Sequence, residues 1–263
     1  MTTAWRPQIA ASILTADFGH LDRVVRKLER AGVDRLHLDV MDGHFVPNLT
    51  FGADVVAAFR RLTSLPLDVH LMISEPSRYV PCFLEARPET ITFHVEADEP
   101  REVMVETLTA IRAAGRGTGL AVSPATPMEA VRPYLELLDA IMVMTVVPGF
   151  GGQHFIPEAA PKISVAREWL AASSGLAHVD GGVNRDTAAL CGHYGADVFI
   201  VGSALFQRGQ DAADEVRLVR DRARAARHMA ERGVSEEPVR ADRNDHHDEF
   251  DDGQPVAFGR TAG

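Results

Sequence analysis

The 263-residue sequence has little of what stabilises small secreted folds or anchors a chain in a membrane. Cysteine occurs only twice, at Cys82 and Cys191, which lie far apart in the chain. A disulfide framework is therefore not expected. Free thiols in a reducing cytosol are expected instead. No segment approaches the roughly 20 apolar residues of a membrane helix. The first residues also lack the apolar stretch of a signal peptide. These absences predict a cytoplasmic protein with no membrane partner.

Positive charge is scarce as well. The chain has 27 Lys and Arg against 37 Asp and Glu, a net charge of −10, which argues against a nucleic-acid partner. The only lysines, Lys27 and Lys162, fall in predicted helices, so Schiff-base chemistry at a strand end is excluded. No Walker A pattern occurs, which disfavours phosphoryl transfer.

Short apolar segments alternate with longer amphipathic segments along most of the chain. The predicted strands are residues 8–14, 35–40, 66–72, 90–95, 118–123, 140–146, 176–180 and 197–202. Helices are predicted between them, most clearly at residues 18–32, 53–63, 101–115 and 157–175, three of which end at a glycine.

Eight strand–helix units in about 210 residues predict a single-domain TIM barrel, a closed (β/α)₈ fold that usually takes about 250 residues. A doubly wound open sheet is the alternative. Such a sheet would normally carry a glycine-rich turn after its first strand, and this sequence has none there.

The last part of the chain has a different composition. Residues 231–263 are polar, acidic and aperiodic, so we expect a disordered tail after a barrel domain at residues 1–230. His246 and His247 lie among aspartates and could bind a metal, but a solvated acidic tail is the favoured interpretation.

Polar side chains gather at the carboxyl ends of the predicted strands, where barrels of this kind place their active sites. They are Ser12, His37, Asp39, His70 and Asp180. In the segment RLHLDV, His37 and Asp39 alternate with leucines, so both project from one face of a strand. Two imidazoles and two carboxylates suit one divalent ion, zinc, iron, manganese or cobalt. Taken alone, a histidine on a strand is usually a core residue and an aspartate after a strand is usually a helix cap, so the prediction depends on the four occurring together.

Other residues near the strand ends have less certain roles. His94 could contact the site or orient a neighbour, so it is left out of the predicted ligand set. Three methionines, Met41, Met72 and Met144, would form an apolar wall around the metal or simply fill the core.

Glycine-rich segments follow the last three strands, at residues 147–153, 180–183 and 201–206. Backbone amides at such loops, with a helix N-terminus behind them, bind a phosphate dianion without lysine. Glycines also simply permit tight turns, but three adjacent loops favour a phosphorylated substrate.

These groups suit proton transfer next to a carbonyl. A metal at the carbonyl oxygen of a ketose phosphate would stabilise an enediolate. Asp39 and Asp180, from strands far apart, would then transfer protons on opposite faces and invert a carbon centre.

Seven segments, in order, closely resemble the ribulose-phosphate 3-epimerase family across residues 8–207. They are IAASILTADFGHL, HLDVMDGHFVPNLTFG, LDVHLMI, SPATP, VPGFGGQHFIP, VDGGVN and GADVFIVGSALF. The resemblance implies a TIM barrel that interconverts D-ribulose 5-phosphate and D-xylulose 5-phosphate, in a cytoplasmic homo-oligomer of the pentose phosphate pathway.

The resemblance also implies roles for individual residues. The metal would be held by His37, Asp39, His70 and Asp180, with Asp39 and Asp180 as the acid/base pair. Substrate would be bound by Ser12, His70, Gly149, Phe150, Gly151, Gly152, Gly181, Gly182, Gly202 and Ser203.

The sequence departs from the family pattern at several positions. Thr145 and Val147 stand where Ser and Asn are usual, and His178 stands where Glu is common. Thr145 and Val147 leave open another ketose phosphate, such as D-allulose 6-phosphate. A non-catalytic phosphosugar-binding paralogue is the remaining alternative, and it would not need two opposed carboxylates.

Overall fold

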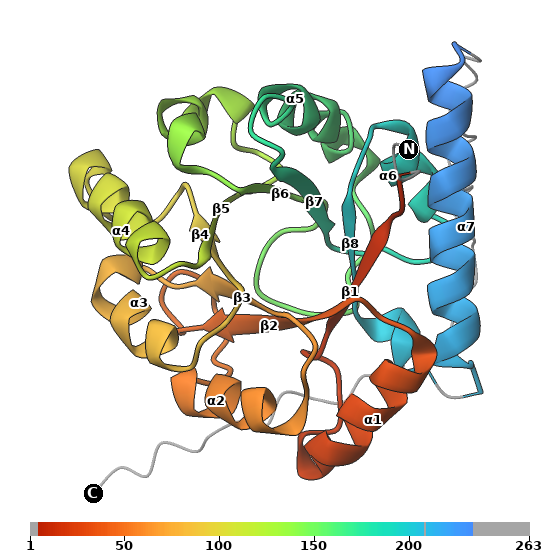
Figure 1. Ribbon diagram of the computed structural model, residues 1–263, viewed down its shortest axis with the longest axis horizontal. Helices are drawn as coiled ribbons and strands as arrows, with labels where there is room; N and C mark the ends of the chain where they lie inside the picture. Colours follow the sequence, from red (N-terminus) through yellow and green to blue (C-terminus); the bar gives the residue numbers. More distant parts are fainter. Residues whose placement is uncertain (1–4, 208, 234–263) are drawn as a thin grey trace, which may run out of the picture.

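The computed structural model describes residues 5–207 and 209–233. Eight parallel strands close into a barrel in sequence order, with helices around the outside (Figure 1). The strands are β1 (Gln8–Ser12), β2 (Arg35–Met41), β3 (Leu67–Met72), β4 (Thr90–His94), β5 (Gly117–Val122), β6 (Ala140–Met144), β7 (Leu176–Asp180) and β8 (Val198–Val201). The predicted single-domain (β/α)₈ barrel is confirmed.

The helices run outside the strands and connect them. They are α1 (Leu21–Ala31), α2 (Ala53–Leu62), α3 (Pro76–Glu85), α4 (Arg101–Ala113), α5 (Lys162–Trp169), α6 (Ala188–His193) and α7 (Ala212–Glu231). Short 3₁₀ segments are η1 (Phe18–His20), η2 (Met128–Ala130), η3 (Arg132–Leu137), η4 (Pro157–Ala159) and η5 (Ser203–Leu205). Residues 234–263, including His246 and His247, lie outside the described residues, so the tail and its boundary stay predictions.

Helix α1 shows how the sequence sets an element's limits. The apolar residues Val24, Val25 and Leu28 are buried against the barrel, as the three- and four-residue spacing predicts. The helix ends where Gly32 takes φ +77°, a left-handed conformation that glycine adopts without steric cost. The predicted glycine stop is confirmed here.

Two connections differ from the prediction. The chain between β5 and β6 forms η2 and η3 in place of an α-helix, and Pro133 lies at the start of η3, where it lacks the amide that a longer helix would need. Helix α5 ends at Trp169, so its predicted end at Gly175 is wrong. Serine hydrogen bonding opposes the helix there, because Ser173 Oγ donates to the Leu170 carbonyl.

The barrel interior has an apolar half and a polar half. Interior residues of β1, β5, β6 and β8 form one apolar cluster, with Ala10, Met142 and Ile200 among its members. The interior positions of β2 and β3 instead carry buried polar side chains, including His37, Asp39, Asp68 and His70. Their alternate residues, such as Leu36 and Leu38, pack outward against the helices. Alternation along β2 and β3 therefore places polar side chains inside the barrel and apolar side chains against the helices.

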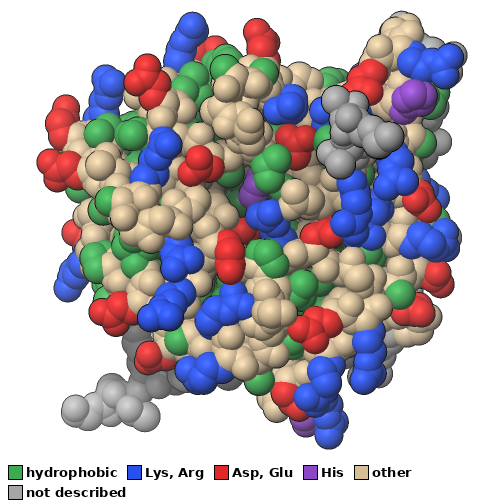
Figure 2. Space-filling model, viewed as in Figure 1, with side chains coloured by type: hydrophobic (Ala, Val, Ile, Leu, Met, Phe, Trp, Pro, Cys, Tyr) green, Lys and Arg blue, Asp and Glu red, His purple; other side chains and the backbone are tan. Residues whose placement is uncertain are grey.

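Acidic and basic side chains are interspersed over the face in view (Figure 2). Within residues 5–207 and 209–233, each helix is too short or too polar to span a bilayer.

Candidate metal and substrate site

Four predicted residues meet at one end of the barrel interior. His37, Asp39, His70 and Asp180 each offer a ligand atom, and all four atoms lie within 4.8 Å of one another. The parallel register pairs Asp39 with His70 on neighbouring strands. Asp180 comes from β7, which is separated from β2 by β8 and β1. Closure of the barrel therefore brings together four residues from three strands, β2, β3 and β7.

The two histidines approach the carboxylates through different ring atoms. His37 Nε2 lies 3.3 Å from Asp39 Oδ1 and 3.8 Å from Asp180 Oδ2. His70 Nδ1 lies 3.2 Å and 3.6 Å from the same two oxygens. Both imidazoles are fully buried, whereas the Asp180 side chain is 13% exposed. The four groups thus converge on one point, and Asp180 is the most solvent-accessible of them.

Burial and nearby charges give the two carboxylates different pKa values. Burial raises the pKa of Asp180 to about 7, and the nearby Asp39 charge adds to that rise. Burial opposes ionisation of Asp39 too, but the nearby charge of His37 holds its pKa well below the usual value. The same interaction overrides the effect of burial on His37 and raises its pKa to about 9. Burial lowers the pKa of His70 to about 4.

The site fits a divalent cation. The buried His37 Nε2 has no hydrogen-bond partner among the described residues, although it faces two carboxylates. A buried polar nitrogen without a partner carries a desolvation cost that a bound cation would remove. Two imidazoles and two carboxylates match zinc, iron, manganese or cobalt. Which of these ions is native stays a matter of proposal.

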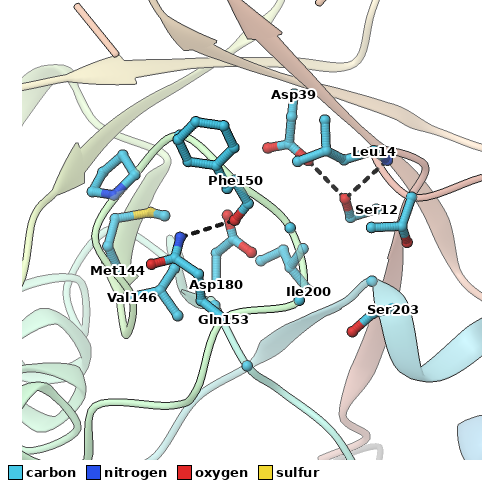
Figure 3. Close-up of a pocket in the computed structure, with 18 of the residues that line it drawn as sticks. Ser12, Leu14, Asp39, Met144, Val146, Phe150, Gln153, Asp180, Ile200 and Ser203 are labelled. Carbon is cyan, nitrogen blue, oxygen red and sulfur yellow. Dashed lines mark hydrogen bonds between the residues drawn. The ribbon is translucent and has the colours of Figure 1, made fainter. Parts of the chain in front are cut away.

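A pocket opens directly above this cluster (Figure 3). Asp39 and Asp180 line it, whereas His37 and His70 do not and lie buried at its base. The other predicted site residues all line the pocket, namely Ser12, Met41, Met72, Met144, Gly149, Phe150, Gly151, Gly152, Gly181, Gly182, Gly202 and Ser203. Of the predicted substrate contacts, His70 alone is therefore absent from the lining.

Two of the loop glycines are required by space as well as by conformation. Gly181 has φ +115°, and a Cβ there would lie 2.5 Å from Val146 Cγ2. Gly182 has φ +64°, and its Cβ would lie 2.7 Å from the Phe155 amide nitrogen. A side chain at either position would push apart the loops after β6 and β7.

The element behind the β8 loop differs from the expectation. Gly202 precedes η5, a single 3₁₀ turn of three residues, where a helix N-terminus was expected. The turn has too few peptide units to add a large dipole, so exposed loop amides would provide the attraction for phosphate.

Several pocket residues were missed by sequence reasoning. Leu14, Thr15, Val146, Pro148, Val183 and Ile200 belong to the lining, and so does Gln153. The Gln153 side-chain amide donates to the carbonyls of Val147 at 2.7 Å and Phe150 at 2.9 Å, bracing the β6–α5 loop from within. Its place in the PGFGGQ segment was visible, but nothing in the spacing indicated that its side chain turns back on the loop.

Two further histidines lie near the cluster. His94 stacks on His70 with ring centroids 5.0 Å apart and does not belong to the four-residue set. His178 is buried inside the barrel, and its Nδ1 has no partner among the described residues. Leaving His94 out of the ligand set agrees with this geometry.

Comparison with known proteins identifies the family. Residues 8–206 match the Ribulose-phosphate 3 epimerase family. The chain belongs to the ribulose-phosphate 3-epimerase family. A Rhodobacter capsulatus protein named ribulose-phosphate 3-epimerase is 45% identical over 209 residues, 80% of this chain and 90% of its own. The Bacillus subtilis protein of that name is 42% identical over 216 residues, 80% of this chain and 98% of its own. The expectation of an isomerase of this family is thereby confirmed.

Solved structures share the family's fold at low sequence identity. 3-Hexulose-6-phosphate synthase from Salmonella typhimurium has a TM-score of 0.63 at 18% identity, covering 83% of this chain and 99% of its own. 3-Keto-L-gulonate-6-phosphate decarboxylase from Vibrio cholerae has a TM-score of 0.63 at 13% identity, covering 83% and 97%. At these identities the likeness concerns the fold alone.

Proposed function

We propose that this chain catalyses epimerisation at C3 of a ketose phosphate, converting D-ribulose 5-phosphate to D-xylulose 5-phosphate. The observation that carries the proposal is the convergence of His37, Asp39, His70 and Asp180 below a glycine-lined pocket. Family membership supports this choice of substrate and reaction. The homo-oligomer and the cytoplasmic location implied by the resemblance remain predictions.

The four clustered residues would hold one divalent metal ion. When bound, such an ion supplies positive charge next to the carbonyl oxygen on which negative charge develops. The glycine loops after β6, β7 and β8 would hold the phosphate, and this would place C3 of the sugar above Asp39 and Asp180.

Asp39 and Asp180 would act as the two acid/base groups. Both carboxylates line the pocket, and they reach it from β2 and β7. One carboxylate would take the C3 proton while the other, protonated, returns a proton to the opposite face. Without the ion, the pKa values of the two carboxylates are already separated, and Asp180 is the more readily protonated of the two.

A second substrate, D-allulose 6-phosphate, was left open by Thr145 and Val147. The Thr145 hydroxyl is buried and donates to the Gly181 carbonyl at 2.6 Å, so it ties β6 to the β7 loop. Neither residue is part of the pocket lining. These contacts favour the pentulose phosphate over a changed specificity.

The test is solvent exchange at C3, followed by NMR. D-Ribulose 5-phosphate is incubated in D₂O with metal-loaded protein, chelated protein and a chelated sample to which metal is restored. We expect metal-dependent loss of the C3 proton signal together with appearance of xylulose 5-phosphate. Absence of exchange in the metal-loaded protein, with exchange of D-allulose 6-phosphate in a parallel tube, would move the assignment to the six-carbon sugar. Sugar binding that persists after chelation without exchange of either sugar would indicate the binding paralogue.

Single carboxamide variants test the two-base assignment. Asp39→Asn and Asp180→Asn are each expected to lower turnover by at least about 10²-fold while the barrel still folds. Each variant should exchange the C3 proton of one epimer only. Asp54→Asn, at an exposed position in the first turn of α2, is the matched control. Metal content is measured in all three, so that loss of the ion is separated from loss of proton transfer. Retention of more than about a tenth of turnover by Asp39→Asn would contradict the assignment.

A further inference from the structure

A buried chain of hydrogen-bonding groups runs outward from the cluster through His94. His94 is the last residue of β4 and is fully buried between Phe45 and His70. Its Nε2 lies 2.9 Å from His70 Nε2, and its Nδ1 lies 2.9 Å from Glu96 Oε2. His70 faces the metal cluster with its other nitrogen, Nδ1. Glu96 is thus connected to the cluster through two imidazole rings.

Glu96 can only accept hydrogen bonds in this setting. Burial opposes its ionisation, but the hydrogen bonds that it accepts lower its pKa to about 2, so it is a carboxylate at neutral pH. Its second oxygen, Oε1, accepts the Ser123 amide at 2.8 Å. Both oxygens are therefore committed as acceptors.

The acceptor at Glu96 favours one set of hydrogen positions along the chain. His94 Nδ1 must carry the hydrogen that it donates to Glu96. With that hydrogen on Nδ1, His94 Nε2 offers a lone pair to the hydrogen of His70 Nε2, 2.9 Å away. His70 Nδ1 also lies 3.2 Å from Asp39 Oδ1, so Asp39 and Glu96 compete for the hydrogens of the two rings. The shorter contact, 2.9 Å between His94 Nδ1 and Glu96, favours the arrangement in which His70 carries its hydrogen on Nε2 and has a lone pair on Nδ1, the atom that faces Asp39 and Asp180. A metal ion binds only such a lone pair.

We propose that Glu96 is a positioning residue that sets the tautomer of His70 through His94 and so prepares His70 Nδ1 for the metal. This inference rests on the metal centre of the proposed function. Carboxylates commonly orient metal-bound histidines by direct contact, and here one imidazole is inserted between the two.

Glu96→Gln is the informative variant because it keeps the size of the side chain and removes one acceptor. The glutamine has one acceptor and one donor group for two incoming N–H groups, those of Ser123 and His94. If its oxygen keeps the Ser123 amide, its NH₂ group faces His94 Nδ1 and reverses both tautomers. His70 Nδ1 would then carry hydrogen and be blocked.

The first readout is the hydrogen position on His70, measured by two-dimensional NMR of ¹⁵N-histidine-labelled, chelated full-length protein. We expect Nε2–H in the wild type and a shift toward Nδ1–H in Glu96→Gln. Glu96→Asp keeps an acceptor-only carboxylate and should retain the wild-type tautomer at least in part. Glu99→Gln, in the same loop, removes a carboxylate that accepts from Ser77, and it should leave the spectrum of His70 unchanged.

The second readout is the Kd for Co²⁺ alone, measured by calorimetry. Glu96→Gln is expected to raise this Kd by about 10–100-fold, and Glu99→Gln to leave it within about twofold. A wild-type protein that carries hydrogen on His70 Nδ1 would overturn the inference, even if Glu96→Gln does not fold. An unchanged tautomer and Kd in folded Glu96→Gln would also overturn it. A wild-type protein that has the expected tautomer but binds no metal would instead contradict the metal centre of the proposed function.

Discussion

The Ser12 hydroxyl donates a 2.7 Å hydrogen bond to Asp39 Oδ2 (Figure 3). The backbone register pairs Ser12 with His37, so its side chain reaches two residues further along β2 to meet the carboxylate. The other oxygen, Asp39 Oδ1, lies near both histidines. Ser12 therefore contacts the proposed acid/base group directly, in addition to lining the pocket where the resemblance placed it as a substrate contact.

Ser12→Ala should impair turnover more than substrate binding. Removing the hydroxyl leaves a buried carboxylate oxygen without its donor, which typically costs about 1.5–3 kcal/mol for a charged group. We expect kcat to fall about tenfold or more at saturating metal, with a smaller change in KM. Ser164→Ala, which removes an exposed hydrogen bond to the Tyr194 carbonyl, is the control. A changed KM with unchanged kcat would assign Ser12 to substrate binding alone.

Gly182→Ala should push apart the glycine loops after β6 and β7, which are proposed to hold the phosphate. The substitution adds left-handed strain of about 1–2 kcal/mol and a Cβ that would meet the backbone of Phe155 at 2.7 Å. We expect a KM at least about tenfold higher for the sugar phosphate and a lower melting temperature. Gly115→Ala has a similar φ of +71° with nothing within 4 Å, so it isolates the conformational cost. Equal kinetic effects in the two variants would refute the role of close approach.

Gln153→Ala should loosen the β6–α5 loop. The side-chain amide donates to two carbonyls of the same loop, those of Val147 and Phe150, and alanine removes both bonds. We expect a several-fold higher KM with little change in global stability, because the bonds are confined to a surface loop. Faster hydrogen exchange at residues 147–153 would support this explanation, and a large drop in melting temperature would contradict it.

His178 should make the metal-free protein sensitive to acid. Burial lowers its pKa from 6.5 to about 4, so between these pH values the unfolded chain binds a proton that the folded chain does not. Its contribution to the free energy of unfolding is therefore complete above pH 6.5 and is lost as the pH falls toward 4. The free energy of unfolding of His178→Leu should decline less than that of the wild type between pH 7 and pH 5. Urea unfolding in chelator measures this, with the exposed His154→Gln as control.

The sequence by itself determined the barrel and the strand face from which its candidate metal ligands project. Alternation in RLHLDV and LDVHLM places His37, Asp39 and His70 inside, because strand side chains change face at every residue. Glycine-rich segments after three consecutive strands likewise indicated the pocket rim. These features follow from local periodicity and chain order, which a single sequence contains.

Tertiary structure decided which of these groups touch. Closure of the barrel brings Asp180 on β7 to His37, and it sets the distances that separate the pKa values of the two aspartates. The contact between His70 and His94 depends on the packing of side chains from neighbouring strands, and the link onward to Glu96 depends on the turn after β4. Strand spacing fixes the face of a residue but not its rotamer or its partner, so the role of Glu96 could be inferred only from the folded chain.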